Sequence, residues 1–176
     1  MTDDVAGWGM FTEEGIEANT RVLTIPQSLC IHPELCRVHI ESIVASSVSQ
    51  ELVPQDFLIL YLVLHKLYEG MDLAEINVSL LHKPYVRILP KTFGTPLEYY
   101  PAELSLLEGT SLYNNAQLQL QRTAESAQRL RAWLVSALET STDPARELLR
   151  SAAQNEKAWL AQCRWAHNVY TRYGIC

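Results

Sequence analysis

The stretch FLILYLVL, Phe57–Leu64, places eight hydrophobic side chains in a row. It follows Pro54, which suits the first turn of a helix, and it precedes Gly70, which suits a helix end. A helix that is apolar on all sides is normally buried in a core. The run is far shorter than the roughly 20 residues that a membrane-spanning helix needs. We therefore expect a buried helix and no membrane span.

Most of the chain beyond residue 32 also has the pattern of helices, because apolar residues recur at intervals of three and four. Proline and asparagine or aspartate mark several starts, and glycine marks ends. The expected helices are Pro33–Ser49, Pro101–Glu108 before Gly109, one through Leu120 and Leu138 after the candidate caps Asn114 and Asn115, and a last one from the N-cap Asp143 and Pro144 to Tyr170.

The first thirty residues have a different character, with strands and turns expected. Arg21–Ile25 is rich in β-branched residues and ends at Pro26, which cannot continue a central ladder. The proline-containing stretch Lys83–Pro90 is expected to be connecting structure, since the helical backbone conformation is disfavoured for a residue that precedes proline. The fold class is therefore α+β and mainly helical, with a short β unit at the start.

Composition narrows the class of function. The chain has 176 residues, enough for one domain, and its net charge of −6 argues against a nucleic-acid binder. Its cysteines, Cys30, Cys36, Cys163 and Cys176, have no CxxC spacing, so no metal site is expected. Reduced thiols and an acidic N-terminus without a signal-peptide pattern favour a cytosolic or nuclear protein.

Few residues have a pattern typical of chemistry. The sequence contains no GxGxxG, GxSxG or SxxK motif. The turn Gly7-Trp8-Gly9 allows backbone to approach a ligand, although these residues taken alone favour a hairpin or bulge with a packed tryptophan. Arg172 could offset a helix dipole or hold a carboxylate. Five scattered histidines are interpreted as packing or surface residues: His32, His39, His65, His82 and His167.

Several short motifs occur in a fixed order from one end of the chain to the other. They are GWGMF at 7–11, EGI at 14–16, RVLTIP at 21–26, PYVRILP at 84–90, LLEGT at 106–110, and WA followed by VYTR at 165–172. Together they resemble the SET-domain protein methyltransferases, specifically the Rubisco large-subunit lysine methyltransferase subfamily. The resemblance implies a SET β unit at 1–32, a helical insertion at 33–164 and the start of a second SET half at 165–176.

The same resemblance implies a site for S-adenosylmethionine. Ala6, Gly7 and Trp8 would contact this cofactor mainly through main-chain groups, and Arg172 would reach it from the end of the last helix. No catalytic residue and no metal ligand is implied for this chain. The family usually has an acidic residue where Ala6 stands, and serine where Thr171 stands, a change that keeps a hydroxyl.

The family continues with an Asn-His pair and a catalytic tyrosine, which this sequence lacks. Methyl transfer to lysine needs near in-line geometry and a neutral amine, whose ordinary pKa is about 10.4. We therefore expect an N-terminal fragment of a protein-lysine N-methyltransferase that is inactive as an isolated chain. Its substrate would be a protein, such as a ribosomal protein or another basic protein. We expect neither a nucleic acid nor a membrane as a partner. The alternative is a short, non-catalytic protein-binding or regulatory module derived from such an enzyme.

Overall fold

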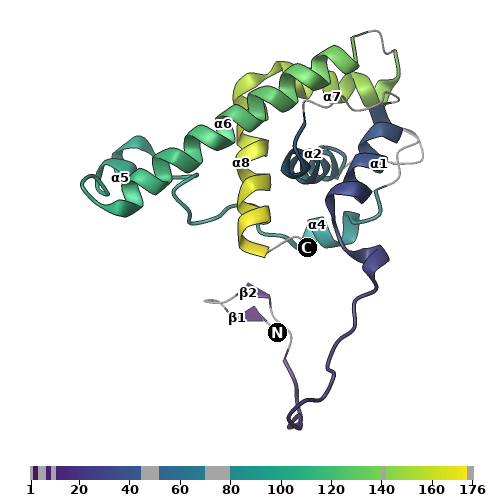
Figure 1. Cartoon of the computed structure of the whole chain (residues 1–176), viewed down its shortest axis with the longest axis vertical. Helices are drawn as coiled ribbons and strands as arrows, with labels where there is room; N and C mark the ends of the chain where they lie inside the picture. The colour runs from purple at the N-terminus through teal and green to yellow at the C-terminus, as the bar shows by residue number, and fades with distance from the viewer. Residues whose placement is uncertain are drawn as a thin grey trace.

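The structure, a computed structural model, describes residues 2–3, 7–8, 11–44, 52–69, 80–139 and 142–173. It is mainly helical, as expected (Figure 1). Its elements are β1 (Thr2–Asp3), β2 (Gly7–Trp8), the 3-10 helix η1 (Gln27–Leu29), α1 (Pro33–Val44), α2 (Pro54–Leu67), α4 (Lys83–Ile88), α5 (Pro101–Ser105), α6 (Ser111–Ala137), α7 (Pro144–Gln154) and α8 (Glu156–Tyr173).

Helix α2 forms the centre of the core. Figure 1 shows it end-on, with α1, α4, α6 and α8 around it, and it contacts all four. Every side chain from Phe57 to Leu64 is buried, which confirms the expectation from its all-round apolar pattern. Burial of each large apolar side chain stabilises the fold by about 1.5–3 kcal/mol. No helix in the described ranges is long and apolar enough to cross a bilayer.

Four expected helix starts are confirmed, including those at Pro33 and Pro101, and one is wrong. Pro54 begins α2, and Asp143 caps α7, where its Oδ1 accepts a hydrogen bond from Ala145 N at 2.9 Å. The start of α6 differs from the expectation that Asn114 or Asn115 caps it. The cap is Thr110, whose Oγ1 accepts from the Tyr113 amide at 3.2 Å. The Thr110 hydroxyl accepts a hydrogen bond from a first-turn amide that would otherwise lack a partner. The helix therefore begins at Ser111, and Asn114 and Asn115 lie inside it.

The expected last helix is in fact two helices. Asn155 interrupts it, with φ −81° and ψ 88°, between α7 and α8. Its side-chain oxygen accepts a hydrogen bond from the amide of Ala158 at 3.2 Å, as an N-cap does. Asparagine competes in this way with the helical backbone, which explains why an uninterrupted apolar stripe did not make an uninterrupted helix.

The stretch expected to be connecting structure also differs, because Lys83–Ile88 forms helix α4. Pro84 lies in the first turn of α4, where its missing N–H removes no intrahelical hydrogen bond. A proline in the first turn is therefore compatible with a helix, and the prolines of this stretch did not exclude one.

Helix α1 is confirmed as far as Val44, while residues 45–49 and Gly70 lie outside the described residues.

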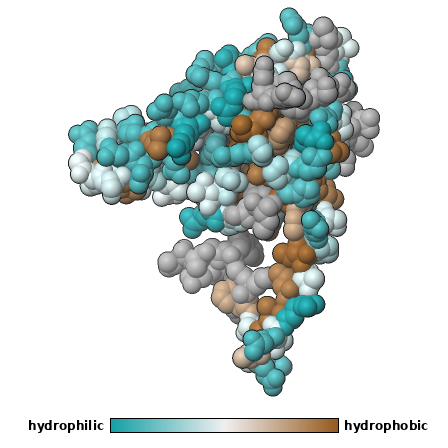
Figure 2. Space-filling view, viewed as in Figure 1, coloured by the Kyte–Doolittle hydropathy of each residue, from teal (hydrophilic) through white to brown (hydrophobic). Residues whose placement is uncertain are grey.

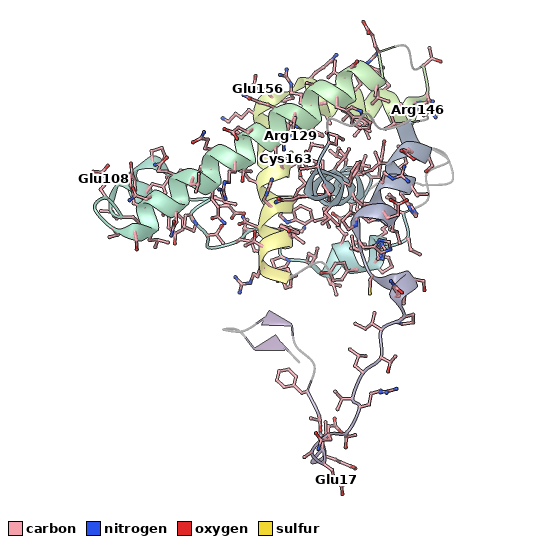
Figure 3. The ribbon with its side chains drawn as sticks, viewed as in Figure 1. Glu17, Glu108, Arg129, Arg146, Glu156 and Cys163 are labelled. Atoms are coloured by element: carbon pink, nitrogen blue, oxygen red, sulfur yellow. The ribbon has the colours of Figure 1, made fainter. Side chains whose placement is uncertain are left out.

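The N-terminal region is a small strand pair followed by an extended segment. Strand β1 pairs antiparallel with β2, with Thr2 opposite Trp8. Arg21–Ile25, expected to be a strand, pairs with none of the residues that the structure describes, and Val22 and Ile25 are 68% and 60% exposed. A strand needs a neighbouring strand to form hydrogen bonds with its backbone groups. The described residues provide no such neighbour beside Arg21–Ile25. Figure 2 shows hydrophobic surface along this segment, and Figure 3 places Glu17 at its tip, away from the helices.

Candidate functional site

Arg172, which the resemblance assigns to a cofactor, lies in the last turn of α8 and is exposed. It forms no ion pair with any residue that the structure describes. At this position the cation stabilises the negative end of the helix dipole. Of the other assigned residues, Gly7 and Trp8 form β2, and Ala6 lies outside the described residues. In Figure 1 the β1–β2 pair and the C-terminal end of α8 lie on the same side of the helical body.

The end of α8 is held by the segment that follows α4. The indole Nε1 of Trp165 donates a hydrogen bond to the carbonyl oxygen of Pro90 at 2.8 Å. The ring of Tyr173 lies edge-on to Phe93, with 6.4 Å between ring centroids. The ammonium of Lys66 lies 4.1 Å from the centre of the Trp165 ring, a distance at which a cation is attracted to an aromatic face.

A side-chain network around Asn168 adds to this attachment. Asn168 is buried, accepts a hydrogen bond from Thr95 Oγ1 at 2.7 Å, and donates one to Glu98 Oε1 at 3.1 Å. The other oxygen of Glu98 accepts from the Phe93 amide at 2.7 Å. Because each partner is itself bonded, the direction in which α8 presents Arg172 is set by residues far away in the sequence.

Buried histidines attach the N-terminal segment to the core. His82 Nε2 lies 3.1 Å from the carbonyl oxygen of Leu29, so it must carry the proton, and His82 Nδ1 accepts from the Tyr61 hydroxyl at 2.7 Å. His65 Nδ1 donates to the Tyr61 carbonyl, and its Nε2 accepts from the His82 amide. Burial lowers the pKa of His65 to about 4 and also lowers that of His82. Their interpretation as packing residues agrees with this arrangement.

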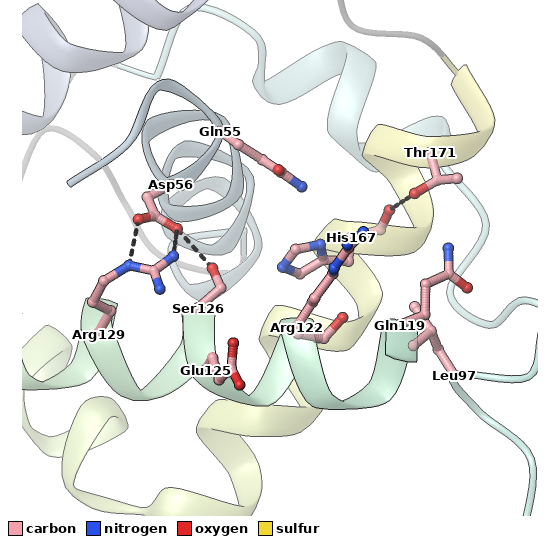
Figure 4. A pocket seen from close by; sticks show the side chains of 11 residues that line it. Gln55, Asp56, Leu97, Gln119, Arg122, Glu125, Ser126, Arg129, His167 and Thr171 are labelled. Carbon is pink, nitrogen blue, oxygen red and sulfur yellow. Dashed lines mark hydrogen bonds and ion pairs between the residues drawn. The ribbon is translucent and has the colours of Figure 1, made fainter. Parts of the chain in front are cut away.

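A second arrangement, which the sequence analysis missed, is a polar cavity of about 310 Å³ among α2, α6 and α8 (Figure 4). Its floor is Asp56, which is only 1% exposed. Arg129 donates two hydrogen bonds of 3.0 Å to the carboxylate, and Ser126 donates a third of 2.7 Å. The hydrogen bonds to Asp56 raise the pKa of the Arg129 guanidinium. The remaining lining residues are Gln55, Leu97, Gln119, Arg122, Thr123, Glu125, His167 and Thr171.

His167 is the exception to the reading of the histidines as simple packing residues. Its side chain lines the cavity, and its buried Nε2 has no hydrogen-bond partner among the described residues. An unpaired buried polar atom costs about 1–3 kcal/mol. Burial lowers the pKa of His167 to about 4, with the Arg129 charge acting in the same direction and the Asp56 charge opposing it. The imidazole is therefore neutral at pH 7.

Two signals in the sequence could have located this cavity. Asp56 follows the cap of an otherwise apolar helix, and a buried carboxylate requires a cationic or hydrogen-bonding partner. Arg122, Ser126 and Arg129 recur at intervals of four and three, which places them on one face of a helix. Neither signal shows which helix faces which.

The cysteines have the properties of packing residues. Cys30, Cys36 and Cys163 are free thiols, and burial raises the pKa of Cys36 and of Cys163 to about 12. Neither is a thiolate at neutral pH, which excludes both as nucleophiles under those conditions. Cys176 lies outside the described residues. Across those residues, no group of histidine, cysteine and carboxylate side chains could hold a metal ion.

Comparisons with protein-family models, with curated proteins and with solved structures found no match.

Proposed function

We propose that this chain is the N-terminal, helix-rich part of an S-adenosylmethionine-dependent protein-lysine N-methyltransferase of the SET-domain class. The observation that carries the proposal is a contact between two of its motifs. The last residue of PYVRILP, Pro90, accepts the hydrogen bond of Trp165, the first residue of the motif that ends at Arg172. The sequence relates these two motifs only by their order, and in the structure they are also in contact.

In this proposal the helices are a scaffold that presents Arg172 to the cofactor. The guanidinium would hold the carboxylate of S-adenosylmethionine, a pairing that its planar donor geometry favours. The backbone of Ala6, Gly7 and Trp8 would contact the same molecule. The extended segment at Arg21–Ile25, with its exposed β-branched side chains, would be one strand of a sheet that further strands complete.

The chain by itself would transfer no methyl group and would bind the cofactor weakly at most. The substrate would be a protein lysine, and an acidic protein of net charge −6 favours a basic partner such as a ribosomal protein. Free thiols fit a cytosolic or nuclear location.

The test begins with the gene. The reading frame is expected to continue past the codon for Cys176 into an Asn-His pair and a tyrosine. Calorimetry of that longer protein should show binding of S-adenosylmethionine, which Arg172→Ala weakens by about tenfold, the loss of one charge-assisted hydrogen bond. The matched control is Lys157→Ala, an exposed cation near the start of the same helix, which should leave the affinity unchanged. A stop codon after Cys176, with no cofactor binding by the expressed chain, would exclude the proposal.

One observation favours the alternative of a non-catalytic binding module. Helix α5, the turn after it and the first half of α6 extend away from the core (Figure 1), and they expose Leu106, Leu112 and Leu118. A single protein partner bound at one-to-one stoichiometry, with affinity that Arg172→Ala does not change but Leu118→Asp abolishes, would support this function. Cofactor binding that depends on Arg172 would count against it.

A further inference from the structure

The polar cavity among α2, α6 and α8 has more hydrogen-bond donors than free acceptors. Asp56 already accepts hydrogen bonds from Val53 N, Ser126 and two nitrogens of Arg129, so its oxygens are occupied. Glu125, the other carboxylate of the lining, accepts from Gln121 at 2.8 Å on the exposed side of α6.

Other hydrogen-bond donors of the cavity remain available. Arg122 lies one helical turn from Ser126 and forms no hydrogen bond or ion pair with any described residue. Figure 4 shows Gln55 from α2, Arg122 from α6 and His167 from α8 directed toward the same space. A guanidinium presents a fork of N–H groups that matches the two oxygens of a carboxylate or phosphate.

His167 is an independent sign of a ligand. It is 8% exposed, and its Nε2 has no partner among the described residues although the ring borders the cavity. A neutral imidazole has one N–H donor, and protonation at Nε2 would give this unpartnered atom a hydrogen bond to offer a ligand. The surrounding charges are Asp56 on α2 and Arg122, Glu125 and Arg129 on α6.

We propose that this cavity binds a small oxyanion, a phosphate or carboxylate group, held by the guanidinium of Arg122 and the Nε2–H of His167. Its volume of about 310 Å³ lies at the small end of the range for ligand pockets, roughly 300–1,000 Å³. Asp56 and Arg129 neutralise each other, while Glu125 at the rim opposes an anion. Binding is therefore weak, and it strengthens when the charge of Glu125 is removed.

The experiment follows the His167 ring in the full chain by NMR, with the signal assigned by its loss in His167→Gln. Inorganic phosphate and malonate are titrated separately at matched ionic strength, with chloride as the reference salt. Each is expected to give a saturable shift. Arg122→Gln should weaken binding by about tenfold, the loss of a charge-assisted contact. Glu125→Gln should strengthen it several-fold, and Arg87→Gln, an exposed cation on α4, should change nothing.

A tighter phosphate complex would assign the site to a phosphate-bearing ligand, and a tighter malonate complex would assign it to a carboxylate. No saturable shift beyond that of chloride would overturn the proposal. Equal affinities in Arg122→Gln and the unchanged protein would overturn it as well. Because Arg172 is not among the lining residues, Arg172→Ala should leave phosphate binding intact, which separates this site from the proposed cofactor site.

Discussion

The carboxylate of Asp56 and the guanidinium of Arg129 form a two-point ion pair between the first turn of α2 and the middle of α6, with both nitrogen–oxygen distances at 3.0 Å. The two residues are 73 positions apart in the sequence. Asp56 is almost completely buried, whereas the side chain of Arg129 is 41% exposed. The pair therefore compensates for the burial of a charge at the floor of the polar cavity.

Removing Arg129 should destabilise the fold, because Asp56 would keep only its bonds to Val53 N and Ser126. We expect Arg129→Ala to lower the free energy of unfolding by about 1–3 kcal/mol, less than for a fully buried pair since solvent reaches the arginine. Urea denaturation measures the change. Arg122→Ala is the matched control on the same helix and should stay within about 0.5 kcal/mol. Equal losses in the two variants would show that the ion pair contributes nothing specific.

Stability should fall in mild acid because of two buried histidines. The folded pKa of His65 and of His167 is about 4, below the ordinary value of 6.5. Protonation then favours the unfolded chain, so stability is complete above pH 6.5 and is lost as the pH falls from 6.5 toward 4. The urea midpoint should be lower at pH 5 than at pH 7. His65→Gln should reduce this difference, and a midpoint independent of pH over this range would contradict the prediction.

The start of α6 offers a direct comparison of two side chains. Thr110→Ala removes the hydroxyl that caps the helix and should cost about 0.5–2 kcal/mol. Asn114→Ala, inside the first turns and exposed, should be neutral or slightly stabilising, because alanine has the highest helix propensity. Circular dichroism during urea denaturation measures both. The reverse order of effects would restore Asn114 as the cap.

The hydroxyl of Tyr61 should control how firmly the N-terminal segment is attached. Tyr61→Phe leaves His82 Nδ1 without its donor, and His82 Nε2 bonds to Leu29. Amide exchange at residues 27–30 should therefore accelerate. Tyr68→Phe makes the same chemical change at the C-cap of the same helix, but the Tyr68 hydroxyl donates to the Ala145 carbonyl at 2.7 Å. It should accelerate exchange in α7 and leave residues 27–30 unchanged; equal effects at both places would contradict the assignment.

Local patterns were sufficient for much of the helical part. The all-round apolar run at Phe57–Leu64 identified a buried helix, and the Asp143-Pro144 pair identified a start to the residue. Errors arose where one side chain has two options. Thr110 and Asn114 can both cap, Asn155 can continue a helix or end it, and Pro84 is compatible with a loop or a first helical turn. Propensity alone does not separate such options, since their energies differ by about 1 kcal/mol.

The sequence by itself determined that most of the chain is helical and that α2 is buried, because periodicity and apolar content act through neighbours in the chain. Only the tertiary structure decided which helices face each other. It brought Asp56, Ser126 and His167 into one cavity and held Trp165 against Pro90, and each of these contacts joins residues on different elements. The physical reason is that burial and charge compensation are shared among side chains distant in sequence, so no short stretch encodes them alone.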